Sequence, residues 1–191
     1  VRGGYAPVNG EGLWWQRWVQ RGCLLLRLVG WNSTLLAASE DQGKLRLGQR
    51  QLRETLGAGA AGEVVLVLSH HPLTGGWLAD EREAGWLLRS RAHLHLTGHV
   101  HEAESRLVRD GGGQELVTLC AGAVHNERGA PPEHGYSLAS LFPRPEDGYA
   151  VRVWPRRWSE RRMAFQEDLD HIPRENIRSG KFSTEHALRE G

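Results

Sequence analysis

The sequence predicts an α/β fold, a layered β-sandwich flanked by helices. Short apolar runs typical of buried strands lie at residues 23–31 and 63–68, and segments with helical character follow them at 48–56 and 80–91. Strand-like runs without intervening helices occupy the later part of the chain. With 191 residues, one domain with a sizeable core is expected.

The first strand and helix have clear boundaries in the sequence. Residues 23–31 read CLLLRLVGW, a mostly apolar run that ends at Asn32 and Ser33 and predicts a buried strand followed by a loop. Leu52 and Leu56 then lie four residues apart, and Gly57 ends the predicted helix.

The next two predicted strands both end in histidines. The run EVVLVL is followed by His70, His71 and a proline, and the segment HLHLT is followed by Gly98, His99 and His101. The helix predicted at 80–91 between them has acidic residues in its first turn and arginines in its last. Alternating strands and helices predict a parallel sheet, in which ligands collect beyond the carboxyl ends of the strands.

After this alternation the pattern changes to antiparallel strands and then to a polar tail. Residues 104–155 contain strand-like runs joined by glycine-rich turns. The stretch 166–191 is polar and predicts a tail or linker outside the core, so the domain is assigned to 1–165. The chain begins at Val1 instead of a methionine, and we expect a piece of a longer protein, with a further domain possible after the tail.

Composition excludes several classes of function. The formal net charge is +1, which implies neither nucleic acid nor an anionic membrane as a partner. Two cysteines are too few for a disulfide framework and favour a reduced, cytoplasmic setting. The longest apolar run falls far short of the roughly 20 residues of a membrane span, so no membrane association is expected.

The histidines suggest a metal site. In the Gly-His-x-His turn, Gly98 lets the backbone bend close to an ion, and His99 and His101 can point into one space. Neutral imidazole is a ready ligand for zinc, iron or manganese. His93 and His95 alternate with leucines and are expected to make ordinary hydrogen bonds on one face of a strand.

Together the segments VVLVLSHHPL and LHLTGHVHE resemble the last two metal-binding motifs of the calcineurin-like metallophosphoesterases, two-metal hydrolases of phosphate esters. The turn VGWNS, the segment DQGKLRLGQRQL and the strand end LCAG are also similar to that family. The resemblance covers about residues 23–155. It implies that the chain is the carboxyl-terminal portion of a metallophosphoesterase domain, truncated at its amino end.

The resemblance implies a role for individual residues. His70 and His99 would bind one metal ion, and His101 would bind the other. His71, at a variable position, would be the candidate catalytic residue facing the substrate. Asn32 at a strand end and His125 in the loop after LCAG, beside Asn126, are the candidate substrate-binding residues.

The family's earlier motifs, Asp-x-His, Gly-Asp-x-x-Asp and Gly-Asn-His-Asp or -Glu, do not occur in this chain. They supply the aspartate that bridges the two ions, which lie about 3.5 to 4 Å apart. We therefore expect two manganese, iron or zinc ions to be incompletely ligated here and the isolated chain to have little activity. The missing amino-terminal part of the domain is an expected partner, and hydrolysis of phosphate mono- or diesters is the function expected of the complete protein.

The sequence leaves two other functions to consider. A non-catalytic binding or regulatory module could retain this fold and some of the histidines. A cupin-type barrel also uses His-x-His, but it requires a glutamate four or five residues later, where Ser105 and Arg106 follow His101. The predicted helices also disagree with an all-β barrel.

The metal hypothesis makes a geometric prediction. The side-chain nitrogens of His70, His99 and His101 should converge within a few ångströms in the folded protein. Histidines that lie on different faces of the sheet would contradict it.

Overall fold

The computed structural model describes residues 14–35, 37–38, 42–57, 62–101, 103–123, 134–145 and 148–189. Within these residues the chain forms ten strands, three α-helices and one 3-10 helix. The candidate residue His125 and its neighbour Asn126 lie outside the described residues.

The larger sheet has six strands, and four of them run parallel. Its order is β1-β2-β3-β4-β6-β5, in which β2, β3, β4 and β6 are parallel and the two edge strands are antiparallel to their neighbours. The strands are β1 (Trp14–Arg21), β2 (Leu24–Trp31), β3 (Glu63–Leu68), β4 (Leu94–Thr97), β5 (Glu104–Arg109) and β6 (Glu115–Cys120).

Two helices cover one face of this sheet. The helices predicted at 48–56 and 80–91 are confirmed as α1 (Gln49–Thr55) and α2 (Glu81–Arg91). Leu52 and Leu88 are fully buried in a core that these helices share with Val29 and Val67 of the sheet. Each helix connects two consecutive parallel strands, and the apolar side chains of both helices point to the same face of the sheet.

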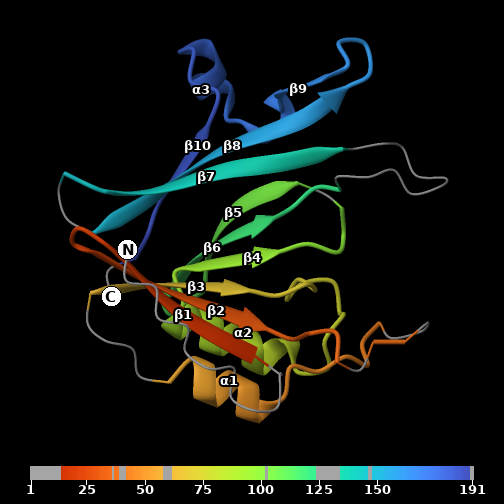
Figure 1. Cartoon of the computed structure of the whole chain (residues 1–191), viewed down its shortest axis with the longest axis vertical. Helices are drawn as coiled ribbons and strands as arrows, with labels where there is room; N and C mark the ends of the chain where they lie inside the picture. Colours follow the sequence, from red (N-terminus) through yellow and green to blue (C-terminus); the bar gives the residue numbers. More distant parts are fainter. Residues whose placement is uncertain are drawn as a thin grey trace.

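A four-stranded antiparallel sheet covers the other face. It contains β7 (Gly135–Pro143), β8 (Tyr149–Ser159), β9 (Ala164–Glu167) and β10 (Thr184–Ala187), with β10 and β9 both paired to β8. A second core lies between the sheets and includes Val64, Leu94, Val117, Val151 and Val153. In Figure 1, α1 and α2 lie at the bottom, β7 and β8 lie at the top, and the six-stranded sheet lies between them.

The predicted fold class, a helix-flanked α/β sandwich of the metallophosphoesterase type, is wrong. The described part of the chain is mostly β, with a mixed six-stranded sheet and an antiparallel sheet. Helices make only two of the connections in the larger sheet, whereas β1–β2 and β5–β6 are hairpins. Because the antiparallel strands bury their apolar side chains against the sheet itself, the second face needs no helices.

The stretch 166–191, expected to be a tail, contributes to the fold as far as the structure describes it. After the 3-10 helix Leu169–His171 and α3 (Arg174–Arg178), β10 pairs with β8 and Leu188 is 5% exposed in the core between the sheets. Only a few apolar residues lie in this segment, so its composition resembles that of a linker. Strand pairing at the edge of β8 anchors it.

The edge strand β1 is the other element whose type the sequence did not reveal. Trp14, Trp15 and Trp18 have a spacing that also suits a helical face, but they lie on a strand paired along its length with β2. Gly22, with a φ of 59°, forms the tight turn between the two strands. The hairpin, not helical periodicity, decides the conformation of this segment.

No described helix is both long enough and apolar enough to cross a membrane.

A buried ion pair joins β2 to the start of β3. Arg27 Nη2 lies 3.0 Å from Glu63 Oε1, and their side chains are 7% and 4% exposed. Arg27 also donates to the Thr55 carbonyl oxygen at 2.9 Å, at the end of α1. Trp31 Nε1 donates to Thr55 Oγ1 at 2.7 Å. One guanidinium therefore ties the helix layer to two parallel strands.

Loss of the Glu63 carboxylate should destabilise the protein. Glu63→Gln leaves the Arg27 charge buried without its counter-ion, and we expect the free energy of unfolding to fall by about 3 kcal/mol. Urea denaturation at pH 7 measures this change. Glu54→Gln, which removes the partner of Arg50 in an exposed pair, is the matched control and should change stability by less than about 0.5 kcal/mol. Equal effects of the two substitutions would contradict this role for the buried pair.

Candidate metal centre

The two histidine-bearing loops leave the sheet side by side. Strands β3 and β4 are parallel neighbours, and their pairing ends at Leu68 and Leu96. Beyond that point the Ser69 amide donates to the Leu96 carbonyl, and the Gly98 amide donates to the His70 carbonyl, both at 3.1 Å. The backbone therefore holds the two loops in contact beyond the carboxyl ends of their strands.

Three histidines converge at this edge of the sheet. One ligand nitrogen from each of His70, His71 and His99 lies within 4.8 Å of the other two. His99 Nδ1 and His70 Nε2 are 3.1 Å apart. His71 is buried, His99 is half-buried and His70 is exposed, so the cluster opens to solvent on one side. Such a group suits a metal ion that retains a free coordination position.

The ring of His71 is held by Ser33. Ser33 Oγ lies 3.1 Å from His71 Nδ1 and also accepts the backbone N–H of His71 at 3.1 Å. When the ring proton is on Nδ1, this nitrogen donates to Ser33 and leaves Nε2 as the metal-binding atom. Ser33 and His71 are both buried, which restricts the orientation of the ring.

An indole ring packs against the same cluster. The centroid of Trp77 lies 4.2 Å from that of His99, with the rings nearly perpendicular, and 6.0 Å from that of His71. Trp77 comes from the loop between β3 and α2. Its ring restricts the orientation of two histidines and excludes water from one side of them.

The turn after β4 places its histidines in an unusual backbone conformation. His99 has a φ of 72° and His101 has a φ of 60°, both in the left-handed region. Residues with side chains adopt this region at a cost of about 1 kcal/mol or more. The turn directs His99 toward His70, whereas His101 is not part of the three-histidine group.

The histidines that come together in the structure are therefore not the same three that the sequence predicts. His70 and His99 come together, but the third member is His71, the candidate catalytic residue, and not His101. Asn32 makes a local turn: its Oδ1 accepts from the Thr34 amide and hydroxyl, each at 3.0 Å.

The histidines within and before β4 have another environment. His93 Nδ1 accepts the Val65 amide N–H at 2.9 Å, and His95 Nε2 lies 2.9 Å from Ser69 Oγ, which donates to the His71 carbonyl. Burial is the main cause that lowers the pKa of both rings from 6.5 to about 4, and at His93 the charges of Arg189 and Arg27 contribute to this decrease. These histidines are neutral structural groups, and the predicted hydrogen bonds are confirmed.

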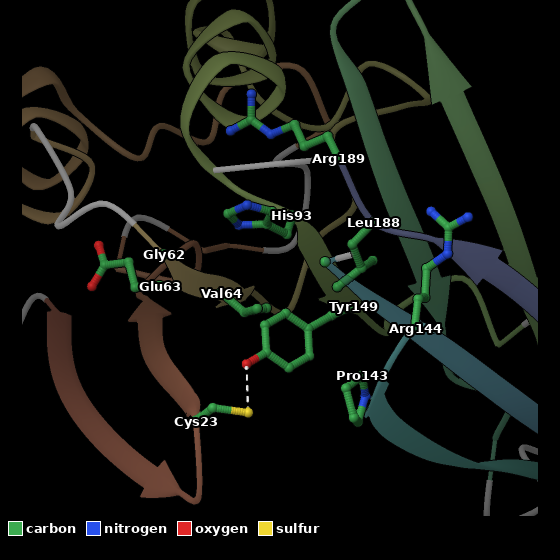
Figure 2. A pocket seen from close by; sticks show the side chains of 11 residues that line it. Cys23, Gly62, Glu63, Val64, His93, Pro143, Arg144, Tyr149, Leu188 and Arg189 are labelled. Carbon is green, nitrogen blue, oxygen red and sulfur yellow. Dashed lines mark hydrogen bonds between the residues drawn. The ribbon is translucent and has the colours of Figure 1, made fainter. Parts of the chain in front are cut away.

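A cavity lies at the ends of β3 and β4 that are opposite to the three clustered histidines. It has a volume of about 450 Å³, and its lining includes residues that begin β3 and precede β4, among them Glu63 and His93. Figure 2 shows Tyr149 among the lining side chains with its hydroxyl directed at Cys23, and the Oη–Sγ distance is 3.6 Å. Glu63 is paired with Arg27 and His93 with a backbone amide. This cavity is separate from the three-histidine group.

Two residues of the site escaped prediction. Ser33 follows a strand that pairs beside β3, which is a signal the sequence carries, but its partner His71 is 38 positions away. Trp77 lies in a glycine-rich loop, where no periodicity indicates which way a side chain points. The sequence predicts the strand ends but not the contacts between loops.

Comparisons with known proteins do not identify the chain. No protein-family model and no curated protein matches it. Among the solved structures that match is the crystal structure of a hypothetical protein from Thermus thermophilus, with 17% sequence identity and a TM-score of 0.45. The match covers 79% of this chain and 65% of that one, so the chain spans less than two thirds of its length. This likeness is too weak to assign a family or a function.

The low pKa values of His93 and His95 predict a loss of stability in acid. The unfolded chain binds protons at these groups near pH 6.5, whereas the folded protein binds them only near pH 4. The free energy of unfolding should therefore decrease as pH falls from 6.5 toward 4, by an amount on the order of 2 kcal/mol per histidine at pH 5. Urea denaturation at pH 7 and pH 5 measures this.

The double variant His93→Asn, His95→Gln is the control, since it retains an acceptor for Val65 and a donor for Ser69 but cannot titrate. It should lose much less stability between pH 7 and pH 5 than the wild type. The same pH dependence in both proteins would show that other groups are responsible.

Proposed function

We propose that His70, His71 and His99 bind one divalent metal ion and that this ion serves the hydrolysis of phosphate esters. The observation that carries the proposal is the convergence of three ligand nitrogens within 4.8 Å at the carboxyl ends of adjacent parallel strands. Ligand and catalytic sites collect at this end of parallel sheets. We infer a phosphate ester as the substrate because the histidine motifs after β3 and β4 resemble those of the metallophosphoesterases.

The donor set fits a single ion such as zinc. At Zn–N distances of about 2.0 to 2.1 Å, two ligands of a tetrahedral ion lie roughly 3.3 Å apart. The 3.1 Å between His99 Nδ1 and His70 Nε2 is close to this separation. The third nitrogen, from His71, lies within 4.8 Å of the other two. Three histidines with an open fourth position are a known arrangement for catalytic zinc.

The residues of the chain have distinct roles in this proposal. His70, His71 and His99 hold the ion, Ser33 orients the His71 ring, and Trp77 shields His99 from water. The ion, when bound, supplies Lewis acidity at the phosphoryl oxygen and lowers the pKa of water. His70 is exposed, so the phosphate group approaches from its side.

The cluster contains histidines alone. Among the described residues, a second group of three metal ligands was not found, and no carboxylate belongs to the first. A two-ion centre needs a bridging carboxylate, so the described residues fit one ion and do not complete the pair predicted from the resemblance. We propose that hydrolysis belongs to the complete protein and that this chain alone is slow.

The all-histidine cluster also favours a second candidate function, a non-catalytic module that binds a metal ion and a phosphate group. Its distinguishing property is metal-dependent binding of phosphate without turnover in the complete protein.

Metal binding should depend on the three clustered histidines. We expect the wild-type chain to bind one Zn²⁺ and His99→Ala to bind it at least 100-fold more weakly, because two imidazoles replace three. Isothermal titration calorimetry measures both affinities. His186→Ala is the matched control, since His186 contacts Ser105 away from the cluster and its loss should leave affinity unchanged. Equal zinc affinity in His99→Ala and wild type would refute the site.

Ser33 should tune the site without binding the ion. Ser33→Ala removes the partner that orients the His71 ring, and loss of such a contact typically lowers metal affinity about 10- to 100-fold. Zinc titration compares this variant with Ser90→Ala, in which the lost hydroxyl donates to the Leu87 carbonyl within α2. The comparison separates the orientation of the His71 ring from a general effect of losing a serine. An unchanged affinity in Ser33→Ala would show that Ser33 does not orient the ligand.

Hydrolysis is tested with the product of the complete reading frame. We expect it to cleave p-nitrophenyl phosphate when Mn²⁺ is supplied, and His99→Ala to lower the rate at least 100-fold while His186→Ala does not. Metal-dependent binding of phosphate with no cleavage would instead establish the non-catalytic function.

A further inference from the structure

A pocket of about 290 Å³ opens beside the histidine cluster, where the helix layer ends. Its floor is formed by alternate residues of three neighbouring strands, which therefore share one face of the sheet. These floor residues are His95 and Thr97 of β4, Leu116, Thr118 and Cys120 of β6, and Glu104, Arg106 and Val108 of β5.

The other side of the pocket is built by α2 and by the loop that carries Trp77. Gly85 and Arg89 of α2 line it, as does the loop from Pro72 to Gly75. Helix α2 packs its buried side chains on the core that contains β2, β3 and Leu116 of β6, so the same face of β5 and of the later residues of β6 forms an open floor next to it.

The pocket adjoins the proposed metal site. Pro72 follows His71 and Val100 follows His99, and both residues line the pocket. Trp77 lines it as well, and its ring contacts that of His99. The pocket lining contains none of the three clustered histidines, so a group bonded to a phosphate at the cluster would reach this space past the Trp77 ring.

The charges in the pocket are neutralised by pairing. Arg89 lies 3.4 Å from Asp110, and Arg106 forms an ion pair with Glu104. His95 is neutral because burial lowers its pKa. The remaining wall is largely apolar, with Trp77 and Val108 among its side chains. A site without unpaired charge favours an uncharged, apolar occupant over a second phosphate or a carboxylate.

We infer that this pocket binds the alcohol portion of the phosphate ester and that this portion is a small apolar ring, such as an aryl group. The inference rests on the proposed function, since the metal ion would hold the phosphate group. The volume lies at the lower end of the range for small-molecule sites, which suits one small ring system and not a polymer. The indole of Trp77 provides an aromatic edge or face for the ring.

The test compares two non-hydrolysable ligands with the zinc-loaded 191-residue protein. We expect naphthylmethylphosphonate to bind at least tenfold more tightly than methylphosphonate in isothermal titration calorimetry, because only the first buries a ring. Equal affinities would overturn the inference. This comparison uses the wild-type protein, so it does not depend on the folding of a variant.

Two neighbouring substitutions on β5 locate the ring. Val108→Phe places a ring inside the pocket and should remove the preference for the naphthyl ligand. Leu107→Phe is the control, because Leu107 points to the opposite face of the strand, is 43% exposed and does not line the pocket. A preference that survives in Val108→Phe, or that disappears equally in both variants, would overturn the assignment of the ring to this pocket.

Removal of the metal separates this inference from the proposed function. If methylphosphonate binds equally with zinc and with EDTA, the metal-dependent function fails. The pocket is then tested by the binding of naphthalenemethanol, an uncharged alcohol that should bind the wild type and not Val108→Phe. If both phosphonates need zinc but bind equally, the proposed function stands and the pocket inference is wrong.

Discussion

The parallel pairing of β3 with β4 is the contact on which the candidate site depends. Ladder hydrogen bonds continue past the last paired residues, where the Gly98 amide donates to the His70 carbonyl. This bond fixes the distance between two loops that are well separated in the chain, and so places His99 beside His70. Neither loop alone carries three histidines in one place, so the three-histidine group depends on the pairing of the two strands.

Burial determines what each histidine can do. His93 and His95 are inside the sheet, hold backbone and serine groups, and remain neutral far into the acid range. His95 and His71 are connected through Ser69, whose hydroxyl bonds the His71 carbonyl. His95 thus supports the backbone of His71.

The sequence predicts helices and strand ends well where local patterns decide them. Residues 48–56 and 80–91 are helical, and His70 and His99 meet as expected from a parallel sheet. The fold class was mistaken because it depends on how many connections are hairpins and on what covers each face, which are long-range properties. The choice of His71 over His101 as the third clustered histidine depends on a positive φ and on a contact with Ser33.

The left-handed conformation of His99 costs conformational stability at a position where the proposed site needs a histidine side chain. Glycine adopts a φ of 72° without the steric cost that a histidine bears, so the backbone of this turn is better suited to glycine. Replacing His99 with glycine would therefore relax the turn and simultaneously remove one of the three clustered imidazoles. Selection for thermal stability alone would favour that substitution and would yield a more stable protein without the three-histidine group.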